Sequence, residues 1–388
     1  MKKKIAIVIT RMIPGGASTV VKNIIDYGQD KFDFTLFSGV EGLTKQEQRI
    51  LSDSYNVVFI PKLIRRISPI NDFFAYSKLK HFFKKNNFNI VHTHTSKAGF
   101  IGRIAAKHAN ISKIIHSTHG SIYMPNSRIP GIPELDIYKK ILLNAEKYLS
   151  PFTNLQIVLS RSEYDFSVQN GLSREKNTMI IPNGIFLENY SFSYDDKKKF
   201  KNELFPYAKD SIILLNIGRL STEKGQFTLL KAFMKLLSEF KQKDIKLIFV
   251  GDGPERKRLE SQSNSMIEKK IVFFTGYVAD PRKYYAAADI FILPSFYEGF
   301  GLSLIEAMAS GLPCVASDTG AIPEIITDRE NGLLFPKGDS DSLKEKIKIL
   351  LENPAFSAKI AKKARESAKK YDIKAILSQY YKIYGDSF

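Results

Sequence analysis

The chain has 388 residues, of which 44% are hydrophobic and 25% are charged, and its formal net charge is +18. This length and composition are those of a folded protein of two or three domains, and they exclude a disordered or fibrous chain. The single cysteine, Cys314, excludes a disulfide framework and a thiolate zinc site, so a reducing, cytoplasmic location is expected. No charge-free apolar run approaches 18 residues, so no membrane-spanning segment is expected.

Short apolar runs alternate with amphipathic segments along the whole chain. The first run follows three lysines and is too short for a signal peptide, so it is predicted to be a buried strand. Residues 225–240 have the clearest helical period, because hydrophobic residues recur there every three or four positions. Strands are predicted at 4–10, 33–38, 56–60, 89–93, 113–118, 155–159 and 178–181, and in a second series at 211–217, 245–250, 271–274, 289–293, 313–316 and 332–335.

This alternation predicts an α/β protein with parallel sheets and helices on both faces of each sheet. A turn signal and a highly charged stretch near 182–210 separate the two series of strands. We therefore expect two doubly wound, Rossmann-like domains, 1–185 and 186–370, that face each other across a cleft. A C-terminal helix at 371–388 is expected to pack back on the first domain. Open sheets of this kind bind ligands beyond the carboxyl ends of their strands.

The densest candidate site follows the fourth strand of the second series. Gly299 and Gly301 lie in a loop that leads into a helix, where main-chain N–H groups and the helix dipole suit a phosphate. Glu298 and Glu306, eight positions apart, could bind sugar hydroxyls. In the alternative interpretation Glu298 is an ordinary loop carboxylate, and Glu306 caps its own helix in a capping box that begins at Ser303.

A second candidate is the loop Gly218–Gly225, which follows the first strand of the second series. Arg219 and Lys224 lie on this loop, where two cations can neutralise a diphosphate. The alternative is a solvated basic loop. The position of the loop at the carboxyl end of a strand favours a role in ligand binding.

A third candidate is the pair Gly15-Gly16, between the first strand and a helix. Adjacent glycines there allow close approach of the backbone to a phosphate or a sugar. The pair is not the G-x-G-x-x-G fingerprint of dinucleotide binding, and on its own it indicates little.

Four of the six histidines, His92, His94, His116 and His119, fall at the ends of two predicted strands. A zinc site is disfavoured, because no carboxylate or thiolate lies close to them in sequence. An imidazole that donates to a sugar or phosphate oxygen fits better, with His119 best placed, while the other three could simply cap strand ends. No D-x-D motif, P-loop or G-x-S-x-G motif is found.

Taken together, these motifs resemble those of the family 4 retaining glycosyltransferases, which have the GT-B fold. The resemblance extends over nearly the whole chain and is specific for the family rather than for the sugar. It rests on Gly15-Gly16-Ala17, His119-Gly120, Pro182-Asn183-Gly184, Gly218-Arg219-Leu220, Glu223-Lys224-Gly225, Gly251-Asp252-Gly253-Pro254, Gly276-Tyr277-Val278 and the pair Glu298/Glu306.

The resemblance implies roles for individual residues. Arg219 and Lys224 would bind the donor diphosphate and stabilise it as it leaves. Glu306 would hold the nucleotide ribose, Glu298 the donor sugar, and His119 would contact the sugar near its anomeric carbon. The resemblance also implies a retaining reaction that needs neither a metal nor another cofactor. The remaining donor-binding positions would be Gly15, Gly16, Gly218, Tyr277, Val278, Gly299, Phe300, Gly301, Leu302 and Ser303.

Residues 91–103 and 115–120 look like those of bacterial members that build surface polysaccharide or lipid-linked oligosaccharide. This likeness implies a UDP-sugar donor, such as a UDP-N-acetylhexosamine, and a glycan or polyprenyl-diphosphate-linked acceptor. Two alternatives stay open. One is a sugar-nucleotide 2-epimerase of related fold; the other is a nucleic-acid-binding protein, which only the net charge suggests and no recognition motif supports.

The positive charge is concentrated in the first half, where residues 1–190 carry 26 basic and 14 acidic side chains. Lysines and arginines alternate with phenylalanines in residues 62–88, and a helix is expected at 71–86. Such a basic, aromatic helix suits the anionic, cytoplasmic face of the inner membrane. In the alternative interpretation its phenylalanines belong to the core. The expected partners are therefore a nucleotide-sugar, an acceptor and an anionic membrane, and no nucleic acid.

Overall fold

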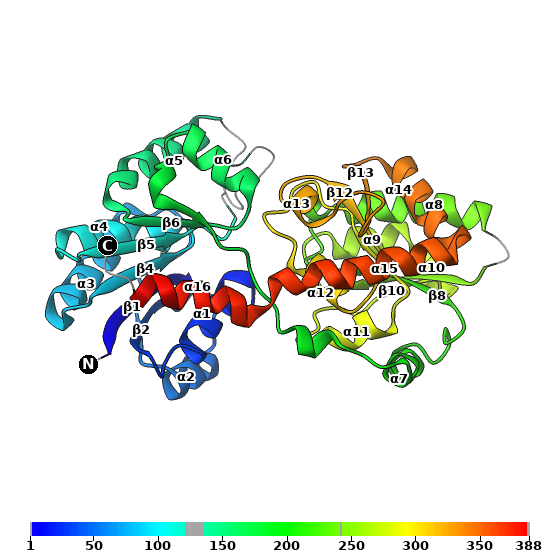
Figure 1. The fold of residues 1–388 in the computed structure, drawn as a ribbon, viewed down its shortest axis with the longest axis horizontal. Helices are drawn as coiled ribbons and strands as arrows, with labels where there is room; N and C mark the ends of the chain where they lie inside the picture. Colours follow the sequence, from blue (N-terminus) through cyan, green and yellow to red (C-terminus); the bar gives the residue numbers. More distant parts are fainter. Residues whose placement is uncertain (1, 121–123, 125–135, 241–242, 386–388) are drawn as a thin grey trace. The chain divides into compact units, whose positions relative to one another are not determined.

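The computed structural model describes residues 2–120, 124, 136–240 and 243–385. The chain divides into two compact units, Met1–Asn183 with Ala375–Phe388, and Gly184–Lys374. Each unit is built on a parallel β-sheet with helices on both faces (Figure 1). The fold class predicted from the alternation of strands and helices, two doubly wound Rossmann-like domains, is confirmed.

The sheet of the first unit has seven strands in the described residues, in the order β3-β2-β1-β4-β5-β6-β7, and neighbouring strands are parallel. The strands are β1 (Lys3–Arg11), β2 (Phe32–Gly39), β3 (Val57–Phe59), β4 (Ile90–His94), β5 (Lys113–Ser117), β6 (Leu155–Val158) and β7 (Thr178–Ile180). The helices are α1 (Gly16–Asp26), α2 (Lys45–Ser54), α3 (Pro69–Asn86), α4 (Ser96–His108), α5 (Asp136–Leu149), α6 (Arg161–Gln169) and most of α16 (Ile373–Gly385).

Successive side chains along each strand point to opposite faces of this sheet, and each face packs against a different set of helices. Ala6 and Val8 of β1 share a buried cluster with α3 and α4, to which Leu79 and Phe83 belong. On the other face lies α16, whose Tyr384 hydroxyl hydrogen-bonds His92 of β4 (O···Nδ1 2.6 Å). Because both faces are covered, β1 is an almost unbroken apolar run.

Helix α3 is the basic, aromatic helix expected at 71–86, and its phenylalanines divide into two groups. Phe83 is buried and Phe82 packs partly buried against the same cluster, so the core interpretation is right for these two. Phe73 and Phe74 are 63% and 54% exposed, so the core interpretation is wrong for the first turns of the helix.

The sheet of the second unit has six strands in the described residues, in the order β10-β9-β8-β11-β12-β13, again parallel. The strands are β8 (Ile212–Ile217), β9 (Ile245–Val250), β10 (Val272–Phe274), β11 (Ile290–Leu293), β12 (Cys314–Asp318) and β13 (Leu333–Pro336). The helices are α7 (Tyr194–Leu204), α8 (Gln226–Glu239), α9 (Arg256–Gln262), α10 (Asn264–Glu268), α11 (Arg282–Ala287), α12 (Leu302–Ala309), α13 (Ile322–Ile325), α14 (Ser340–Glu352) and α15 (Pro354–Ala368).

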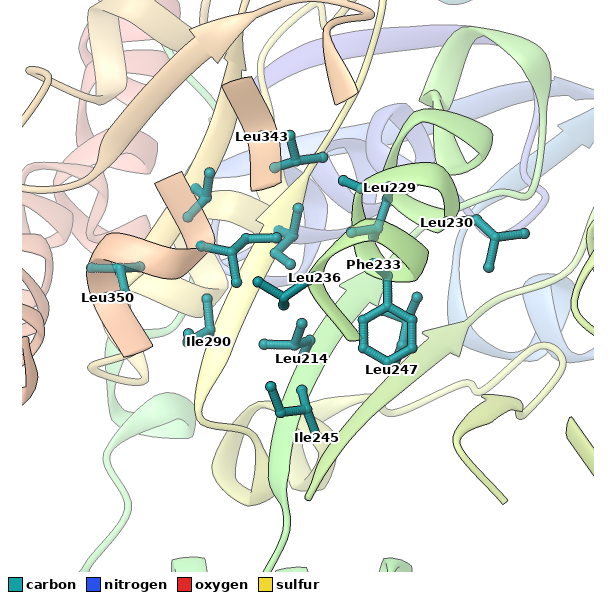
Figure 2. Close-up of a cluster of buried hydrophobic side chains, with 14 of the residues drawn as sticks. Leu214, Leu229, Leu230, Phe233, Leu236, Ile245, Leu247, Ile290, Leu343 and Leu350 are labelled. Carbon is teal, nitrogen blue, oxygen red and sulfur yellow. The ribbon is translucent and has the colours of Figure 1, made fainter. Parts of the chain in front are cut away.

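The core of this unit lies between the sheet and the helices α8 and α14 (Figure 2). Leu229, Phe233 and Leu236 form the apolar stripe of α8 and pack on Leu214 and Leu247 of the strands. Of the hydrophobic residues whose period predicts the helix at 225–240, Leu230 and Phe233 are buried in this core, and three others pack partly buried against it: Phe227, Leu237 and Phe240. This packing holds α8 against the sheet, and α8 in turn follows the loop at the carboxyl end of β8.

All thirteen predicted strands are present, each within two residues of its predicted ends. Short 3₁₀ turns connect several elements: Ser150–Phe152, Glu175–Asn177, Leu187–Tyr190, Thr222–Lys224 and Lys369–Tyr371. Among the helices in the described part of the chain, none is both long enough and apolar enough to cross a membrane.

Candidate active site

In the second unit the loops after β8 and β11 meet, because these strands are neighbours in the sheet. The Phe296 N–H donates to the carbonyl of Glu223 (2.9 Å) and joins the two loops. Gly225 stands at their closest approach with φ +67°, and a Cβ there would lie 1.9 Å from the carbonyl oxygen of Pro294. A glycine is therefore required at this crossing.

Lys224 and Glu298 form an ion pair across the joined loops. The Lys224 ammonium donates to Glu298 Oε2 (2.7 Å), and the Ser295 hydroxyl donates to the same oxygen (3.1 Å). Both charged side chains are largely but not fully buried, with 27% and 12% of their surfaces exposed. The pair places a cation and an oriented carboxylate together at the carboxyl edge of the sheet.

The N-terminus of α12 opens directly beside this pair. Gly301 is the N-cap at φ +95°, and it has no side chain to hydrogen-bond the first turn. The N–H groups of Leu302 and Ser303 lie in that first turn, where a helix leaves its amides without intrahelical partners. The ring of Phe300 packs against Tyr371 (centroids 5.7 Å) and anchors the loop. Uncapped amides and the helix dipole are the features that favour an anion at a helix N-terminus.

Glu306 points toward two tyrosines rather than toward its own helix N-terminus. The Tyr285 hydroxyl donates to Glu306 Oε2 (2.6 Å), and Tyr190 also hydrogen-bonds this carboxylate. Burial raises the pKa of the Glu306 carboxyl, while the two phenol hydrogen bonds act in the opposite direction. The capping-box interpretation is therefore wrong, because the N-cap is Gly301 and not the residue expected.

The other predicted donor-binding residues occupy neighbouring loops of the same edge. The loop after β10 joins the loop after β9 through the Gly251 N–H and the carbonyl of Gly276 (2.9 Å). Next to it Tyr277 is 66% exposed and Val278 is half-buried. Arg219 is exposed, and its carbonyl accepts from the Gln226 amide (2.9 Å). Gly218 adjoins Arg219, and Gly299 adjoins Glu298.

The predicted residues of the first unit lie around a pocket of about 460 Å³ at the carboxyl ends of β1 and β4. We call it the β1–β4 pocket. It is lined by Ile9, Thr10, Arg11, Ile13, Pro14, Gly15, Gly16, Ala17, Ser18, Arg65, Thr95, Ser96, Lys97, Thr118, His119, Gly120 and Asn183. The structure thus brings Gly15, Gly16 and His119 together at one pocket.

The histidines face the interior of the first unit. His94 Nδ1 hydrogen-bonds His119 Nε2 (2.7 Å), and His92 hydrogen-bonds Tyr384 and the Ser117 hydroxyl. Burial lowers the pKa of the His119 imidazole to about 4 and that of the His92 and His94 imidazoles well below the usual value. These rings are therefore neutral at pH 7, and the idea that His92 and His94 merely cap strand ends is wrong.

His116 lies on the opposite face of the sheet, because side chains alternate along β5. Its Nδ1 hydrogen-bonds the Thr93 hydroxyl (3.0 Å), and burial lowers its pKa well below the usual value. It too is an interior residue rather than a cap. In the described residues, no group of three or more histidine, cysteine or acidic side chains is arranged to hold a metal ion.

Sequence reasoning missed several residues of these two sites. Arg11 ends β1, and Lys97 lies in the first turn of the helix that follows β4. A cation near the carboxyl end of a buried strand was a signal that could have found them. Tyr190 and Tyr285 have no such signal, because they reach Glu306 from separate segments.

Two parallel-sheet units, an uncapped helix with an ion pair at a carboxyl edge, and a glycine-rich loop in the other unit define a GT-B-fold enzyme. The comparisons with known proteins agree. The protein-family model described as Glycosyltransferase Family 4 matches residues 14–189, and the model described as Glycosyl transferases group 1 matches residues 196–367. The chain belongs to the family 4 glycosyltransferases of the GT-B fold.

Curated relatives from bacteria are similar over most of their length. The UDP-Gal:alpha-D-GlcNAc-diphosphoundecaprenol alpha-1,3-galactosyltransferase of Escherichia coli is 28% identical over 75% of this chain and 74% of its own. The N-acetyl-alpha-D-glucosaminyl L-malate synthase of Bacillus anthracis is 27% identical over 82% of this chain and 80% of its own.

Among solved structures, the crystal structure of Anabaena HepE in complex with UDP and glucose is similar in fold. Its TM-score is 0.82 at 23% identity, with 99% of this chain and 100% of that chain covered. The lipopolysaccharide glycosyltransferase WaaG gives a TM-score of 0.76 at 15% identity, over 99% and 100% of the two chains. At these identities the likeness concerns the fold.

Proposed function

We propose that this glycosyltransferase moves a hexosyl or N-acetylhexosaminyl group from a UDP-sugar with retention of anomeric configuration and without a metal. The acceptor is a glycan or a polyprenyl-diphosphate-linked sugar, and the product enters bacterial cell-surface polysaccharide. The observation that carries the proposal is the Lys224–Glu298 pair beside the uncapped N-terminus of α12.

The departing nucleoside diphosphate gains negative charge in the transition state. Arg219, Lys224 and the first amides of α12 are placed to stabilise that charge, because protein cations and oriented dipoles act without reorganising. Glu298 holds Lys224 in position and presents its remaining carboxylate oxygen to the donor sugar. These cations supply the charge that a divalent ion would otherwise supply, which supports a reaction without metal.

In a retaining transfer of this kind the bond between the anomeric carbon and the diphosphate oxygen breaks first. The acceptor hydroxyl then attacks the same face, and its proton passes to the departing phosphate oxygen. No protein nucleophile is needed. In the first unit, His119 would contact a sugar, and the Gly15-Gly16 loop would contact the donor or the acceptor. The UDP and glucose bound by HepE support a UDP-sugar donor.

The acceptor side is proposed from relatives and from the surface of α3. The Escherichia coli relative acts on a diphosphoundecaprenol-linked sugar. The exposed Phe73 and Phe74, with the basic residues around them, support contact with the anionic, cytoplasmic face of the inner membrane. We therefore place the enzyme in the cytoplasm as a peripheral membrane protein.

The test is a transfer assay with a panel of nucleotide-sugars, after thermal-shift screening has found the donor. A ligand at a hundred times its Kd should stabilise the fold by about 2.7 kcal/mol. Arg219→Ala and Lys224→Ala should each lower kcat about a hundredfold or more. Lys231→Ala, an exposed lysine on α8, is the matched control and should keep full activity.

Three outcomes would contradict parts of the proposal. Near-normal turnover in both Arg219→Ala and Lys224→Ala would remove the assigned donor site. Loss of activity with a chelator, restored by a divalent metal, would contradict the metal-free reaction. Conversion of the UDP-sugar to an epimer without any acceptor would indicate the 2-epimerase instead.

A further inference from the structure

The loop after β11, which carries Glu298, has a neighbouring loop on each side, because β11 lies between β8 and β12 in the sheet. On the side of β8 the neighbour is the loop that carries Lys224. On the side of β12 the neighbour is the segment 317–321, which we call the β12 segment. Three residues of this segment are buried, each with 8% or less of its surface exposed: Ser317, Thr319 and Ala321.

Two hydroxyls of the β12 segment hold carbonyl groups of the loop after β11. The Ser317 hydroxyl donates to the carbonyl of Ser295 (2.5 Å), and the Thr319 hydroxyl donates to the carbonyl of Phe296 (2.9 Å). Because each peptide unit is planar, turning a carbonyl toward β12 fixes the whole unit to which it belongs. The hold on Ser295 reaches the Glu298 carboxylate directly, because the Ser295 hydroxyl donates to that carboxylate (3.1 Å).

A third contact acts on the peptide between Glu298 and Gly299. The Ala321 N–H donates to the Glu298 carbonyl (3.1 Å). Gly320 packs on the same carbonyl, since a Cβ on this glycine would lie 2.1 Å from the carbonyl oxygen. A peptide that precedes a glycine can flip at little cost, because glycine populates both signs of φ. The β12 segment therefore holds this peptide in one orientation, and with it the main chain from which the Glu298 side chain extends.

We infer that Ser317 and Thr319 are positioning residues of the donor site, which hold Glu298 in the orientation that it needs to contact the donor sugar. The inference rests on the proposed function, which gives Glu298 that contact, and it adds the residues that hold the carboxylate in place. Both hydroxyls are buried and bonded to main-chain carbonyls, so they act through the loop rather than on the donor. A displacement of about 1 Å near the reacting atoms can cost about a hundredfold in rate, so support on both sides of the loop matters.

The same hydrogen bonds also join the β12 segment to the rest of its unit, so they stabilise the fold whether or not they serve the reaction. Loss of a bond that only stabilises lowers the free energy of unfolding and leaves the folded enzyme fully active. Loss of a positioning bond lowers the activity of the folded enzyme as well, and it does so only while the Glu298 carboxylate is present.

The first experiment removes the Thr319 hydroxyl and keeps the size of the side chain, in Thr319→Val. Turnover is measured with whichever of UDP-glucose, UDP-galactose and UDP-N-acetylglucosamine gives the largest thermal shift. kcat/KM should fall about tenfold, as for one lost hydrogen bond. The Kd for UDP should stay the same, because UDP carries no transferable sugar for Glu298 to contact. Thr319→Ser keeps the hydroxyl and should restore most of the activity.

The second experiment repeats Thr319→Val in the background of Glu298→Gln. The substitution should cost almost nothing there, because the group that Thr319 positions is already altered. Equal losses in the two backgrounds would overturn the inference. A Kd for UDP that weakens as much as kcat/KM falls would also overturn it, since the whole loop would then be loosened.

Failure of the positioning role and failure of the proposed function give different results. Low activity of Glu298→Gln beside full activity of Thr319→Val would contradict the positioning role alone. Full activity of Glu298→Gln would contradict the proposed role of Glu298 at the donor sugar, and the inference with it.

Ser317→Ala tests the inference independently, including the case in which Thr319→Val does not fold. It should lower kcat/KM about tenfold, because Ser295, the residue that it releases, contacts the carboxylate. Ser263→Ala is the matched control, since the Ser263 hydroxyl is equally buried and donates to the carbonyl of Leu259 (2.8 Å) in another part of the unit. The control should lower the urea midpoint and leave kcat/KM unchanged. Equal activity of Ser317→Ala and Ser263→Ala would show that the β12 segment only stabilises the fold.

Discussion

Among single residues, Glu306 shows how hydrogen bonds can partly offset the cost of burying a carboxylate. Its burial raises its pKa, and the hydroxyls of Tyr285 and Tyr190 oppose that rise by donating to the charged form. The two tyrosines are themselves buried and stack edge-to-face with centroids 5.9 Å apart. A carboxylate held in this way has one fixed orientation toward the proposed ribose site.

Tyr285→Phe removes one of these donors and keeps the ring. We expect the pKa of Glu306 to rise further, because the charged form loses a hydrogen bond. UDP binding should then weaken as the pH falls, and it should do so at a higher pH than in the unaltered protein. Calorimetric Kd values between pH 5 and pH 8 measure the shift, with an approximately tenfold loss at the acid end.

Tyr194→Phe is the matched control, because Tyr194 is exposed and contributes no hydrogen bond to Glu306. Its pH profile should coincide with that of the unaltered protein. An identical profile in Tyr285→Phe would show that the tyrosine is only a packing residue.

The sequence predicts part of this site and misses part for a physical reason. Lys224 and Glu298 lie in the loops that follow two buried strands, and because these parallel strands are neighbours, the loops meet although the residues are 74 positions apart. Tyr285 and Tyr190 lie in a short helix and a 3₁₀ turn, where no periodicity or spacing indicates which side chain faces Glu306. Their role depends on packing that the sequence alone does not state.

At the level of elements, the crossing of the loops after β8 and β11 depends on one glycine. Gly225→Ala should lower the free energy of unfolding by about 2 kcal/mol or more. The alanine would have to adopt a left-handed φ, and its Cβ would also clash with the carbonyl oxygen of Pro294. It should also lower kcat, since the loops that pair Lys224 with Glu298 are forced apart. Urea unfolding and the transfer assay measure the two effects.

Gly171→Ala provides the comparison, because Gly171 has the same φ of +67° and nothing within 4 Å of an added Cβ. It should lower the free energy of unfolding by only about 1 kcal/mol, the cost of the left-handed φ alone, and leave turnover unchanged. If the two substitutions destabilise equally, the close approach at Pro294 contributes nothing.

The histidines between the first sheet and its helices make stability depend on pH. Their folded pKa values lie below 6.5, so the unfolded chain binds protons first as the pH falls. Their contribution is complete above pH 6.5 and is lost progressively below it. Each buried histidine should add a slope of about 1.4 kcal/mol per pH unit to the free energy of unfolding.

Urea unfolding at pH 7.5, 6.5 and 5.5 checks this dependence. His92→Gln should reduce the slope by the contribution of one histidine, about 1.4 kcal/mol per pH unit. His81→Gln, at an exposed histidine of α3, is the control and should leave the slope unchanged. A free energy of unfolding that stays constant from pH 7.5 to pH 5.5 would contradict the assignment of neutral, buried rings.

The strands are the elements that the sequence predicts best, because a strand buried on both faces is a short apolar run bounded by turn signals. Helix α3 shows where the prediction stops. Phenylalanines occur in pairs near both ends of the helix, but only Phe82 and Phe83 pack against the buried cluster that includes residues of the sheet. The hydrogen bond from Tyr384 to His92 joins residues 292 positions apart, and no local pattern indicates it.

For the whole molecule, the net charge of +18 and the exposed phenylalanines at the start of α3 both favour binding to an anionic membrane. Lysines and arginines near a bilayer contribute about 1 kcal/mol each through attraction to anionic lipid, and this term weakens with salt. Phe73 and Phe74 can add apolar burial, which salt does not screen. The full chain should therefore bind vesicles that contain anionic lipid much more tightly than neutral ones.

Co-sedimentation with vesicles of phosphatidylglycerol and phosphatidylcholine separates these two contributions. Raising the salt concentration should weaken binding of every variant, because it screens the charges alone. Phe73→Ser with Phe74→Ser should weaken binding by about tenfold or more at any salt concentration, since two aromatic side chains no longer enter the lipid. Met234→Ser, an exposed apolar residue of the second unit, should have no effect. Equal binding to neutral and anionic vesicles would contradict the electrostatic part, and unchanged binding of the double variant would show that α3 is not the contact surface.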